Sequence, residues 1–415
     1  MPDPRTLSSG PTLPRKYRLR RALLRLAGLL LNPPPALRIP HPAPTTHGPL
    51  RILLIRPDHL GDVLLTTPAF ARLRQVQPEA RLTALVGPWA EAVARRNPHL
   101  DEVLTLPFPG FTRQPAVSLV APYRQVWQAA RWLRQYRFDA AIVLRVDHWW
   151  GGLLAALAGI PQRVGYAAPD VAPFLTHALP YQPLEHVTRQ SLVLVEEVGR
   201  LGRLGSAPGE WEPGQPPTEF PLRDEERAAA QAWLRARGVG NNERLVAVHP
   251  GAGAAVKLWT AAGWAQVADA LAGERRVVLT GSAAEAPLTA EVARLMRRPA
   301  LDAAGATDLP LLAALLARCD LALGPDAGAL HLATAVGTPT VRLYGPVNPR
   351  QFGPWGDPQF HRVVVVDPPL ACQFCERLDY PASELPLHPC VRWIQPSAVL
   401  AAAHAVLFQT TTSAR

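Results

Sequence analysis

Short apolar runs alternate with helix-length amphipathic stretches along most of this 415-residue chain, and this alternation is its most constraining feature. It is the pattern of β-strand, α-helix, β-strand units, which build parallel sheets. The pattern occurs twice, once from Arg51 and again from Leu245. The expected strands are Arg51 to Arg56, Arg81 to Val86, Glu102 to Leu106, Asp139 to Leu144, Arg163 to Tyr166, Leu245 to His249, Arg276 to Thr280, Leu321 to Gly324, Thr340 to Tyr344 and Arg362 to Val366. We therefore predict an α/β chain with two doubly wound, Rossmann-like domains.

The domain boundaries follow from the interval between the two series. This interval is rich in Gly and Pro, which is typical of a linker, and we place the linker at residues 204–222. Residues 51–203 then form the first domain and residues 223–395 the second. We expect residues 396–415 to form a last helix and a tail.

The segment before the first domain, residues 1–50, carries most of the net charge. It holds eight Lys and Arg residues and one acid, so it contributes +7 of the net +10. A protein that binds nucleic acid spreads its cations over the fold, so this distribution argues against a nucleic-acid partner. Within the segment, residues 15–31 combine six cations with leucines at near-helical spacing, and prolines follow at once. This predicts an amphipathic helix and then a Pro-rich tether.

Three interpretations of this helix fit the sequence. A helix that is cationic on one side and apolar on the other suits the surface of an anionic membrane. The helix can instead pack on the protein's own surface. A secretory signal is the third interpretation, but Arg25 interrupts the apolar core and no small-residue cleavage site precedes the prolines. No run approaches the roughly eighteen uninterrupted apolar residues of a membrane-spanning helix.

The cysteines indicate a compartment but not a metal. Four cysteines in a chain of this length do not form the disulfide framework of a secreted domain, which favours a reducing cytoplasm. Cys372, Cys375, His388 and Cys390 offer four zinc ligands, but the second pair is compressed to His-x-Cys and lacks the usual spacing. We predict no metal and no cofactor, with zinc at these four residues as the alternative.

Ligands of open parallel sheets bind at the carboxyl ends of the strands, so the loops there indicate the chemistry. These loops contain neither the Gly-x-Gly-x-x-Gly of nicotinamide enzymes nor the Gly-x-x-x-x-Gly-Lys-Ser/Thr of kinase-like NTPases. The Asp-x-Asp typical of metal-dependent, single-domain sugar transferases does not occur either. These absences favour a metal-free enzyme with two facing domains.

The loop after the first strand supplies a candidate general base. Gly61 permits a tight turn into the next helix, and Asp62 lies at the start of that helix. Asp62 is either a helix cap or a carboxylate that takes a proton from an attacking hydroxyl group. Asp58 and His59 are nearby competitors for the same role.

Three loops of the second domain supply a candidate anion site. The first, after His249, contains Gly251 and then Lys257, which is the only lysine outside residues 1–50. Glycines let backbone N–H groups approach a phosphate, and a lysine adds a compact positive charge. The other two loops contain Gly281 and Glu285, and Asp326, Ala327, Gly328 and His331. Glu285 suits either a ribose or the start of a helix, and a lone His such as His331 is often structural.

Together these loops resemble glycosyltransferase family 9, the bacterial heptosyltransferases of lipopolysaccharide core assembly. The likeness covers roughly residues 50 to 408 and rests on motifs in a fixed order: Leu60-Gly-Asp-Val with Thr67-Pro68, His249-Pro-Gly with Lys257 and Trp259, Thr280-Gly-Ser, Gly324-Pro-Asp-Ala-Gly with His331, and Leu343-Tyr-Gly-Pro with Asn348-Pro. It implies a GT-B fold, in which the last helix, here within residues 396–415, commonly crosses back onto the first domain. It also implies an inverting, metal-independent transfer of a sugar from a nucleotide donor, typically ADP-heptose. The expected acceptor is a glycolipid or glycan of the cell envelope, and the expected place is the cytoplasm, at the inner face of the plasma membrane.

The resemblance also implies roles for individual residues. Asp62 matches the family's proposed base, Lys257 a diphosphate contact and Glu285 a nucleoside contact. Asp326, Gly328 and His331 match the donor-binding loop, in which Ala327 replaces a frequent Ser or Thr and so lacks one hydroxyl contact. Two other hypotheses are a nucleotide-sugar epimerase or different transferase on the same fold, and a non-enzymatic protein of envelope assembly. The acceptor-side loops, Arg145 to Trp150 and Gly165-Tyr166, are rich in aromatic and charged groups.

Overall fold

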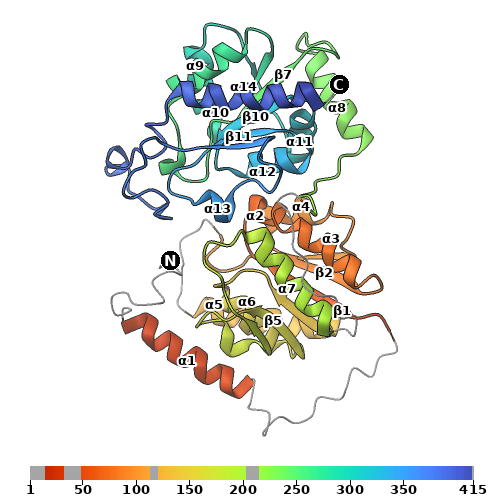
Figure 1. Cartoon of the computed structure of the whole chain (residues 1–415). Helices are drawn as coiled ribbons and strands as arrows, with labels where there is room; N and C mark the ends of the chain where they lie inside the picture. The colour runs from red at the N-terminus through yellow and green to blue at the C-terminus, as the bar shows by residue number, and fades with distance from the viewer. Residues whose placement is uncertain (1–14, 32–47, 113–119, 202–214, 414–415) are drawn as a thin grey trace. The chain divides into compact units, whose positions relative to one another are not determined.

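A computed structural model describes residues 15–31, 48–112, 120–201 and 215–413 of the chain. The chain divides into two compact units, Met1–Trp211 and Glu212–Arg415, and each is a sheet covered by helices (Figure 1). In the described part of the chain, no helix is long and apolar enough to cross a membrane.

The first unit is built on a six-stranded, wholly parallel sheet with the order β3-β2-β1-β4-β5-β6. Central strand β1 is buried from its second residue to its last, as expected for a strand covered on both faces. The strands are β1 (Arg51–Arg56), β2 (Arg81–Val86), β3 (Glu102–Thr105), β4 (Ala140–Val143), β5 (Gln162–Tyr166) and β6 (His177–Leu179).

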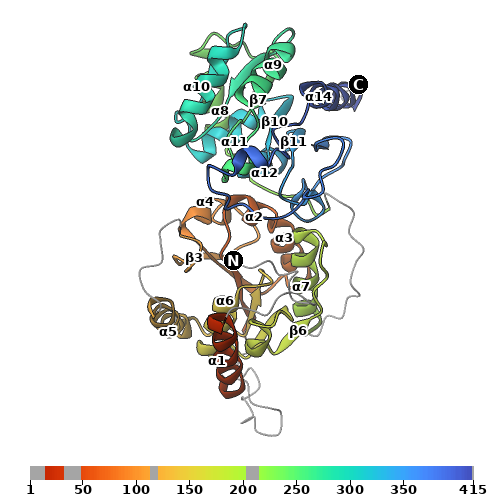
Figure 2. The ribbon, with the colours of Figure 1, turned by 90° about the vertical axis from the view of Figure 1, so that its left-hand side faces the viewer.

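Helices cover both faces of this sheet. α5 and α6 pack together on one side, and α3 and α7 pack together on the other (Figure 2). The apolar helix α6 is almost wholly buried, because α5 and α1 both contact it. The helices are α1 (Arg15–Leu31), α2 (Leu60–Leu64), α3 (Thr67–Val76), α4 (Glu91–Ala94), α5 (Ala121–Leu133), α6 (Trp149–Leu157) and α7 (Val187–Leu201), with short 3-10 turns at η3 (Pro88–Ala90), η4 (Arg134–Tyr136) and η5 (Ala172–Phe174).

The predicted amphipathic helix of residues 15–31 forms, and one of its faces packs on the first unit. Leu24 belongs to the hydrophobic core, and Ala27 and Leu31 pack against that core. Gly28 lies so close to η5 that an added Cβ would meet Pro173 at 2.3 Å. For this face of the helix, the structure therefore agrees with packing on the protein's own surface.

The second unit repeats the architecture of the first. Its six parallel strands have the order β12-β11-β10-β7-β8-β9, so each sheet follows the Rossmann order 3-2-1-4-5-6 when its strands are numbered from its own first strand. The predicted α/β class with two doubly wound domains is confirmed. The sequence missed one short edge strand in each unit, β6 and β9. The strands are β7 (Leu245–Val248), β8 (Arg276–Leu279), β9 (Leu301–Asp302), β10 (Leu321–Pro325), β11 (Thr340–Leu343) and β12 (His361–Val364).

The helices of the second unit again form two layers. α9 contacts α10 and α14, and α11 contacts α8 and α12. The elements are α8 (Asp224–Arg235), α9 (Ala261–Leu271), α10 (Ala286–Leu295), α11 (Leu309–Ala317), α12 (Gly328–Ala335), α13 (Pro349–Phe352) and α14 (Pro396–Ser413), with 3-10 turns at η6 (Ala255–Lys257), η7 (Ala283–Glu285) and η8 (Leu385–Leu387).

The expected last helix forms as α14. α14 contacts α9 and strands β10, β11 and β12 of the second unit. Val399, Ala403, Val406 and Leu407 belong to the core of that unit. Within the second unit, the apolar side chains of the helix therefore complete the cover of the sheet.

Candidate active site

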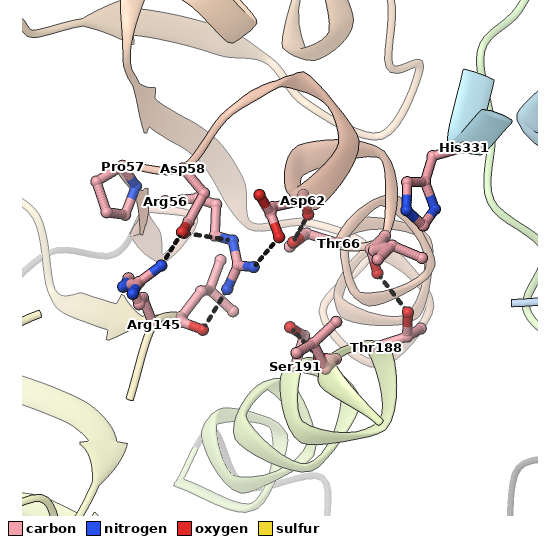
Figure 3. Close-up of polar contacts among 12 residues, drawn as sticks. Arg56, Pro57, Asp58, Asp62, Thr66, Arg145, Thr188, Ser191 and His331 are labelled. Atoms are coloured by element: carbon pink, nitrogen blue, oxygen red, sulfur yellow. Dashed lines mark hydrogen bonds and ion pairs between the residues drawn. The ribbon is translucent and has the colours of Figure 1, made fainter. Parts of the chain in front are cut away.

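Asp62 lies in the first turn of α2, directly beyond the carboxyl end of β1 (Figure 3). The residue at the cap position of this helix is His59, and Asp62 is the third residue of the helix. The side chain of Asp62 is 31% exposed, and its Oδ1 atom lies 3.9 Å from Arg56 Nη2. An ionised carboxylate that keeps contact with solvent is suited to accept a proton from a bound hydroxyl group.

Asp58, the nearest competitor, has a different environment. Its side chain is 2% exposed and forms ion pairs with Arg56, at 3.0 Å, and with Arg145 (Figure 3). Burial alone would raise the pKa of Asp58, but the two guanidinium charges outweigh this effect and lower it. Asp58 is therefore a fixed anion that joins the loops after β1 and β4, and it is a poor proton acceptor.

The acceptor-side loop after β4 packs around this anion. Arg145 also pairs with Asp147 at 2.6 Å, and its guanidinium lies 5.2 Å from the ring centre of Phe111. His148 is buried against the rings of Phe108 and Phe111, and burial lowers its pKa to about 3. The loop that the sequence marked as rich in aromatic and charged groups is thus a packed cluster around an ion pair.

In the second unit, Lys257 and Asp326 form an ion pair between two loops. Lys257 ends η6, after β7, and Asp326 follows β10; the Lys257 Nζ atom lies 2.6 Å from Asp326 Oδ2. Although burial opposes the charge of Asp326, Lys257 and His331 hold its pKa well below the usual value. An ammonium group has three N–H donors, and Lys257 also donates to the backbone carbonyl of Asp326 at 3.4 Å, so one donor remains for another anion while Asp326 orients the ammonium group.

His331, in the first turn of α12, contacts the same ion pair. Its Nε2 atom lies 3.8 Å from Asp326 Oδ1, and its Nδ1 atom lies 3.0 Å from Arg342 Nη1. A guanidinium only donates hydrogen bonds, so Nδ1 must accept and the remaining proton is on Nε2, toward Asp326. Burial and the charge of Arg342 lower the pKa of His331 to about 4, so the ring is neutral near pH 7.

Arg342 is a residue that the site hypothesis missed. It lies in β11, is fully buried, and donates to the carbonyl of Leu330 at 2.7 Å and to Thr334 as well as to His331. The available signal was a charged residue within the otherwise apolar run Thr340 to Leu343, in a strand expected to be buried on both faces. The buried arginine places a positive charge behind the loop that contains Asp326 and His331.

Glu285 closes the start of η7, and two glycines make room for it. Its Oε2 atom accepts from the backbone N–H of Ser282 at 2.7 Å and from the Ser282 hydroxyl at 2.8 Å. A Cβ on Gly251 would lie 2.1 Å from Glu285 Oε1, and one on Gly281 would lie 3.2 Å from Glu285 Cβ. The structure thus gives Glu285 the helix-start contact considered from the sequence, and it places the carboxylate beside the first glycine of the loop after β7.

Ala327 and Gly328 begin α12. Ala327 occupies the cap position and has no side-chain cap hydrogen bond, and Gly328 is the first helical residue. A Ser or Thr at the cap would satisfy backbone N–H groups of the first turn, and Ala cannot. The first turn of α12, next to Asp326, is therefore able to donate to an external anion.

The residues considered for zinc are Cys372, Cys375, His388 and Cys390. Among the residues that the structure describes, no three His, Cys, Asp or Glu side chains come together as a metal site requires. Cys375 Sγ lies 3.6 Å from the hydroxyl of Tyr380, whose ring stacks on His388. Cys390 is buried, and an added Cβ on Gly345 would lie 2.6 Å from its Sγ atom.

The structure thus collects the predicted residues into three groups. Asp62 lies with Arg56 and Asp58 in the first unit. In the second unit, Lys257 and His331 both contact Asp326. The third group is Glu285 with Gly251 and Gly281.

Comparison with known families decides what kind of protein carries these groups. The model of glycosyltransferase family 9 (heptosyltransferase) matches residues 126–375, more than half of the chain. The chain belongs to glycosyltransferase family 9. The matched range contains every predicted donor-binding residue of the second unit, and Asp62 lies before it.

Curated relatives and solved structures agree with this assignment. The chain is 27% identical over 308 residues to lipopolysaccharide heptosyltransferase 3 of Escherichia coli K12, a match that covers 71% of this chain and 82% of the relative. It superposes with a TM-score of 0.70 on the crystal structure of the family 9 glycosyltransferase from Veillonella parvula, at 23% identity and covering 87% and 98% of the two chains. The TM-score with E. coli ADP-heptose lps heptosyltransferase II is 0.67, at 21% identity and covering 87% and 100%. This family 9 chain is a glycosyltransferase of the heptosyltransferase-like kind.

Proposed function

We propose that this glycosyltransferase transfers heptose from ADP-heptose to a glycolipid or glycan of the cell envelope, with inversion at the anomeric carbon and without a metal ion. The names of the relatives suggest the heptose, the ADP and the lipopolysaccharide acceptor. The single observation that carries the proposal is the group formed by Lys257, Asp326 and the uncapped first turn of α12.

This group suits the diphosphate of a nucleotide sugar. Lys257 supplies a full positive charge, and the N–H groups at the start of α12 supply partial charge and hydrogen-bond donors. The carboxylate of Asp326 would repel a diphosphate, so its proposed part is to orient Lys257. Glu285 is the proposed partner of the ribose, through a carboxylate that stands above Gly251.

The proposed reaction is a single displacement. The acceptor oxygen forms a bond to the anomeric carbon while the bond from that carbon to the phosphate oxygen breaks. ADP leaves with the electron pair, and the proton of the acceptor hydroxyl passes to Asp62. The departing diphosphate gains negative charge, so Lys257 and the α12 N–H groups stabilise the transition state more than the bound donor.

The proposed base is Asp62 because the environment of Asp58 excludes Asp58. Asp58 is buried between Arg56 and Arg145, and its lowered pKa disfavours proton uptake. Asp62 keeps 31% of its side chain exposed, and its Oδ1 atom lies 3.9 Å from Arg56 Nη2. The proton that it accepts is released to solvent after product leaves.

A glycolipid acceptor would be anchored in a membrane, and we propose that the enzyme works at the inner face of the plasma membrane. The cationic helix α1 supports this assignment, because anionic lipids attract cations with about 1 kcal/mol for each Lys or Arg near the surface.

The test is a calorimetric titration of the full-length protein with ADP, UDP, GDP and their sugar conjugates. We expect ADP and ADP-heptose to bind, and we expect Lys257→Ala to weaken binding by about a hundredfold, as loss of a charge-assisted contact at a helix start predicts. Arg298→Ala removes an exposed cation of the same unit and is the matched control.

The outcomes separate the possibilities. Binding of ADP that depends on Lys257 supports the proposed donor. Preference for another nucleotide contradicts ADP-heptose, and absence of binding contradicts the donor site altogether. Release of free ADP only when an acceptor is present distinguishes transfer from epimerisation of the donor.

A further inference from the structure

The helix α1 has two faces of opposite character. Leu24, Ala27 and Leu31 face the hydrophobic core of the first unit. Four leucines on the other face are exposed by 57 to 76%: Leu23, Leu26, Leu29 and Leu30. Exposed leucines at this density on one helix face form an apolar strip that has no cover in the described part of the chain.

A second exposed strip lies on α5, which follows the described residue Val120. Tyr123 is 42% exposed and Trp127 is 53% exposed, and four residues separate them, so both lie on one face of the helix. The guanidinium of Arg131 lies 4.7 Å from the ring centre of Trp127. Trp and Tyr with an apolar body and a polar edge are the side chains that accumulate at membrane interfaces.

Trp149, the first residue of α6, joins the two strips. The Arg20 guanidinium of α1 lies 5.6 Å from the Trp149 ring centre, and the Tyr123 ring of α5 lies 5.7 Å from it. Both helices contact α6, and both appear on the same side of the first unit, away from α3 and α7 (Figure 2). The two strips therefore form one surface, which we call the α1–α5 surface.

The charged residues in the two helical segments of the α1–α5 surface are all positive. Residues 15–31 contain six Lys and Arg and residues 120–137 contain four, and neither segment contains an Asp or Glu. Asp170 pairs with Arg20 and Arg21 at 2.7 Å and fixes α1 to the unit. Arg25 on α1 and Arg124 on α5 are exposed beside the apolar side chains.

We propose that the α1–α5 surface is the membrane-binding face of this enzyme and that its partner is a bilayer containing anionic lipid. Leucines and Trp127 enter the boundary between headgroups and acyl chains, and the arginines contact lipid phosphates. This inference deepens the membrane assignment of the proposed function, because it adds α5 to α1 and gives the bilayer contact a definite face. Charge complementarity selects the partner. Two copies of the chain that met through this surface would bring arginines together, and the repulsion between them disfavours such a dimer.

The experiment is co-sedimentation of the full-length protein with vesicles of phosphatidylcholine alone and with vesicles that also contain phosphatidylglycerol. We expect binding to the anionic vesicles that weakens with salt. The double variant Leu26→Glu/Leu30→Glu should weaken it by about a hundredfold, and Trp127→Ala by about tenfold. All three positions are exposed, so the fold should be kept, and circular dichroism checks this.

Matched controls come from the second unit. Leu387 is 74% exposed and Trp393 is 58% exposed. Leu387→Glu and Trp393→Ala change the same side-chain types at similar exposure, and we expect both variants to bind vesicles as well as the wild type does.

Three results would overturn the inference. Equal binding to both kinds of vesicle, or none, removes the anionic bilayer as partner. Full binding by Trp127→Ala removes α5 from the surface. A wild-type dimer in sedimentation velocity that the double variant converts to monomer assigns the surface to a second copy of the chain.

Failure here is distinguishable from failure of the proposed donor. Calorimetry with ADP-heptose reports only on the second unit, and the surface variants should leave its result unchanged. Vesicle binding without donor binding contradicts the proposed reaction and keeps the membrane face. Donor binding without vesicle binding does the reverse.

Discussion

The two units have the same strand order, and in both an ion pair joins the loop after the first strand to the loop after the fourth. In the first unit the negative residue, Asp58, follows the first strand and the positive residue, Arg145, follows the fourth. In the second unit the positive residue, Lys257, follows the first strand and the negative residue, Asp326, follows the fourth. The scaffold and the connection are shared, and the polarity is reversed.

The reversal separates a structural ion pair from a ligand site. Asp58 is 2% exposed between two arginines, so its charge is paired within the protein and does not face a ligand. Lys257 is 15% exposed, has one carboxylate partner, and follows a loop with glycines. One fold thus supports opposite uses of the same loop position, because function is a property of the side chains placed there.

The largest predicted effect concerns Asp62, which lies near the ion pair of Asp58 and Arg145. Asp62→Ala removes the proposed base, and we expect turnover to fall by about a thousandfold, since general base catalysis contributes on that order. ADP-heptose binding should remain, because the donor groups are in the other unit. Turnover is measured as ADP release, and binding by calorimetry. Unchanged turnover would remove Asp62 from the mechanism.

The structural pair itself is sharpened by comparing Asp58→Asn with Asp326→Asn. Asp58→Asn removes the buried carboxylate that pairs with Arg56, which is 4% exposed, and with Arg145. Arg56 then keeps Asp62 at 3.9 Å, and Arg145 keeps Asp147. We expect Asp58→Asn to lower the free energy of unfolding by about 3 to 5 kcal/mol, the usual cost of breaking a buried ion pair. Asp326→Asn removes the carboxylate partner of Lys257, whose side chain is 15% exposed, and of the neutral His331, so its effect on stability should be smaller.

Hydrogen exchange of the core strands in each unit measures this difference, because it reports the two units separately. The comparison fails if Asp326→Asn destabilises its unit as much as Asp58→Asn does. In that case, the pair in the second unit would be as structural as the pair in the first.

The sequence predicted the fold well because strong local patterns determine it. The central strands are continuous apolar runs, and their order follows from the alternation with helices. The edge strands β6 and β9 have three and two residues, which is too short to give a pattern. The position of α14 depends on which apolar surface it covers, and this is a tertiary property that local sequence does not contain.

The site was predicted only in part, for a similar reason. Lys257, Asp326 and Gly251 stand in loops at strand ends, where residue type alone suggests chemistry. The ion pair of Asp58 depends on Arg145, which is 87 residues away in the sequence. Only the parallel pairing of β1 with β4 brings the two residues together. Arg342 acts through His331, and this contact between β11 and α12 likewise has no signature in the sequence.

Acid is expected to affect the second unit more than the first. Among the described histidines, burial lowers the pKa of His331 to about 4, of His361 to about 3 and of His249, all in the second unit, and of His148 to about 3 in the first. Each is neutral when folded and has an ordinary pKa near 6.5 when unfolded. Their contribution to stability is complete above that value and is lost as the pH falls toward the folded pKa.

The expected loss is about 1.4 kcal/mol per pH unit for each such histidine between pH 6.5 and pH 4. Asp58 and Asp326 have lowered pKa values, so their loss begins only below the ordinary carboxylate value of 3.8 and does not enter this window. Hydrogen exchange at two pH values within the window, corrected for the intrinsic rate, is the measurement. Equal loss of protection in both units would contradict the difference in histidines.

The smallest predicted effect concerns the glycine-containing loop after β7. A Cβ at Gly251 would lie 2.1 Å from Glu285 Oε1, whereas a Cβ at Gly253 would meet nothing within 4 Å. Glu285 Oε1 is the far end of a flexible side chain, so Gly251→Ala should displace it with little loss of stability. If Glu285 holds the ribose, Gly251→Ala weakens ADP-heptose binding by about tenfold, or about 1.4 kcal/mol, and Gly253→Ala leaves it unchanged. Equal affinities in calorimetry would assign Glu285 to the start of its helix alone, and the second unit would then bind its donor through Lys257 and α12.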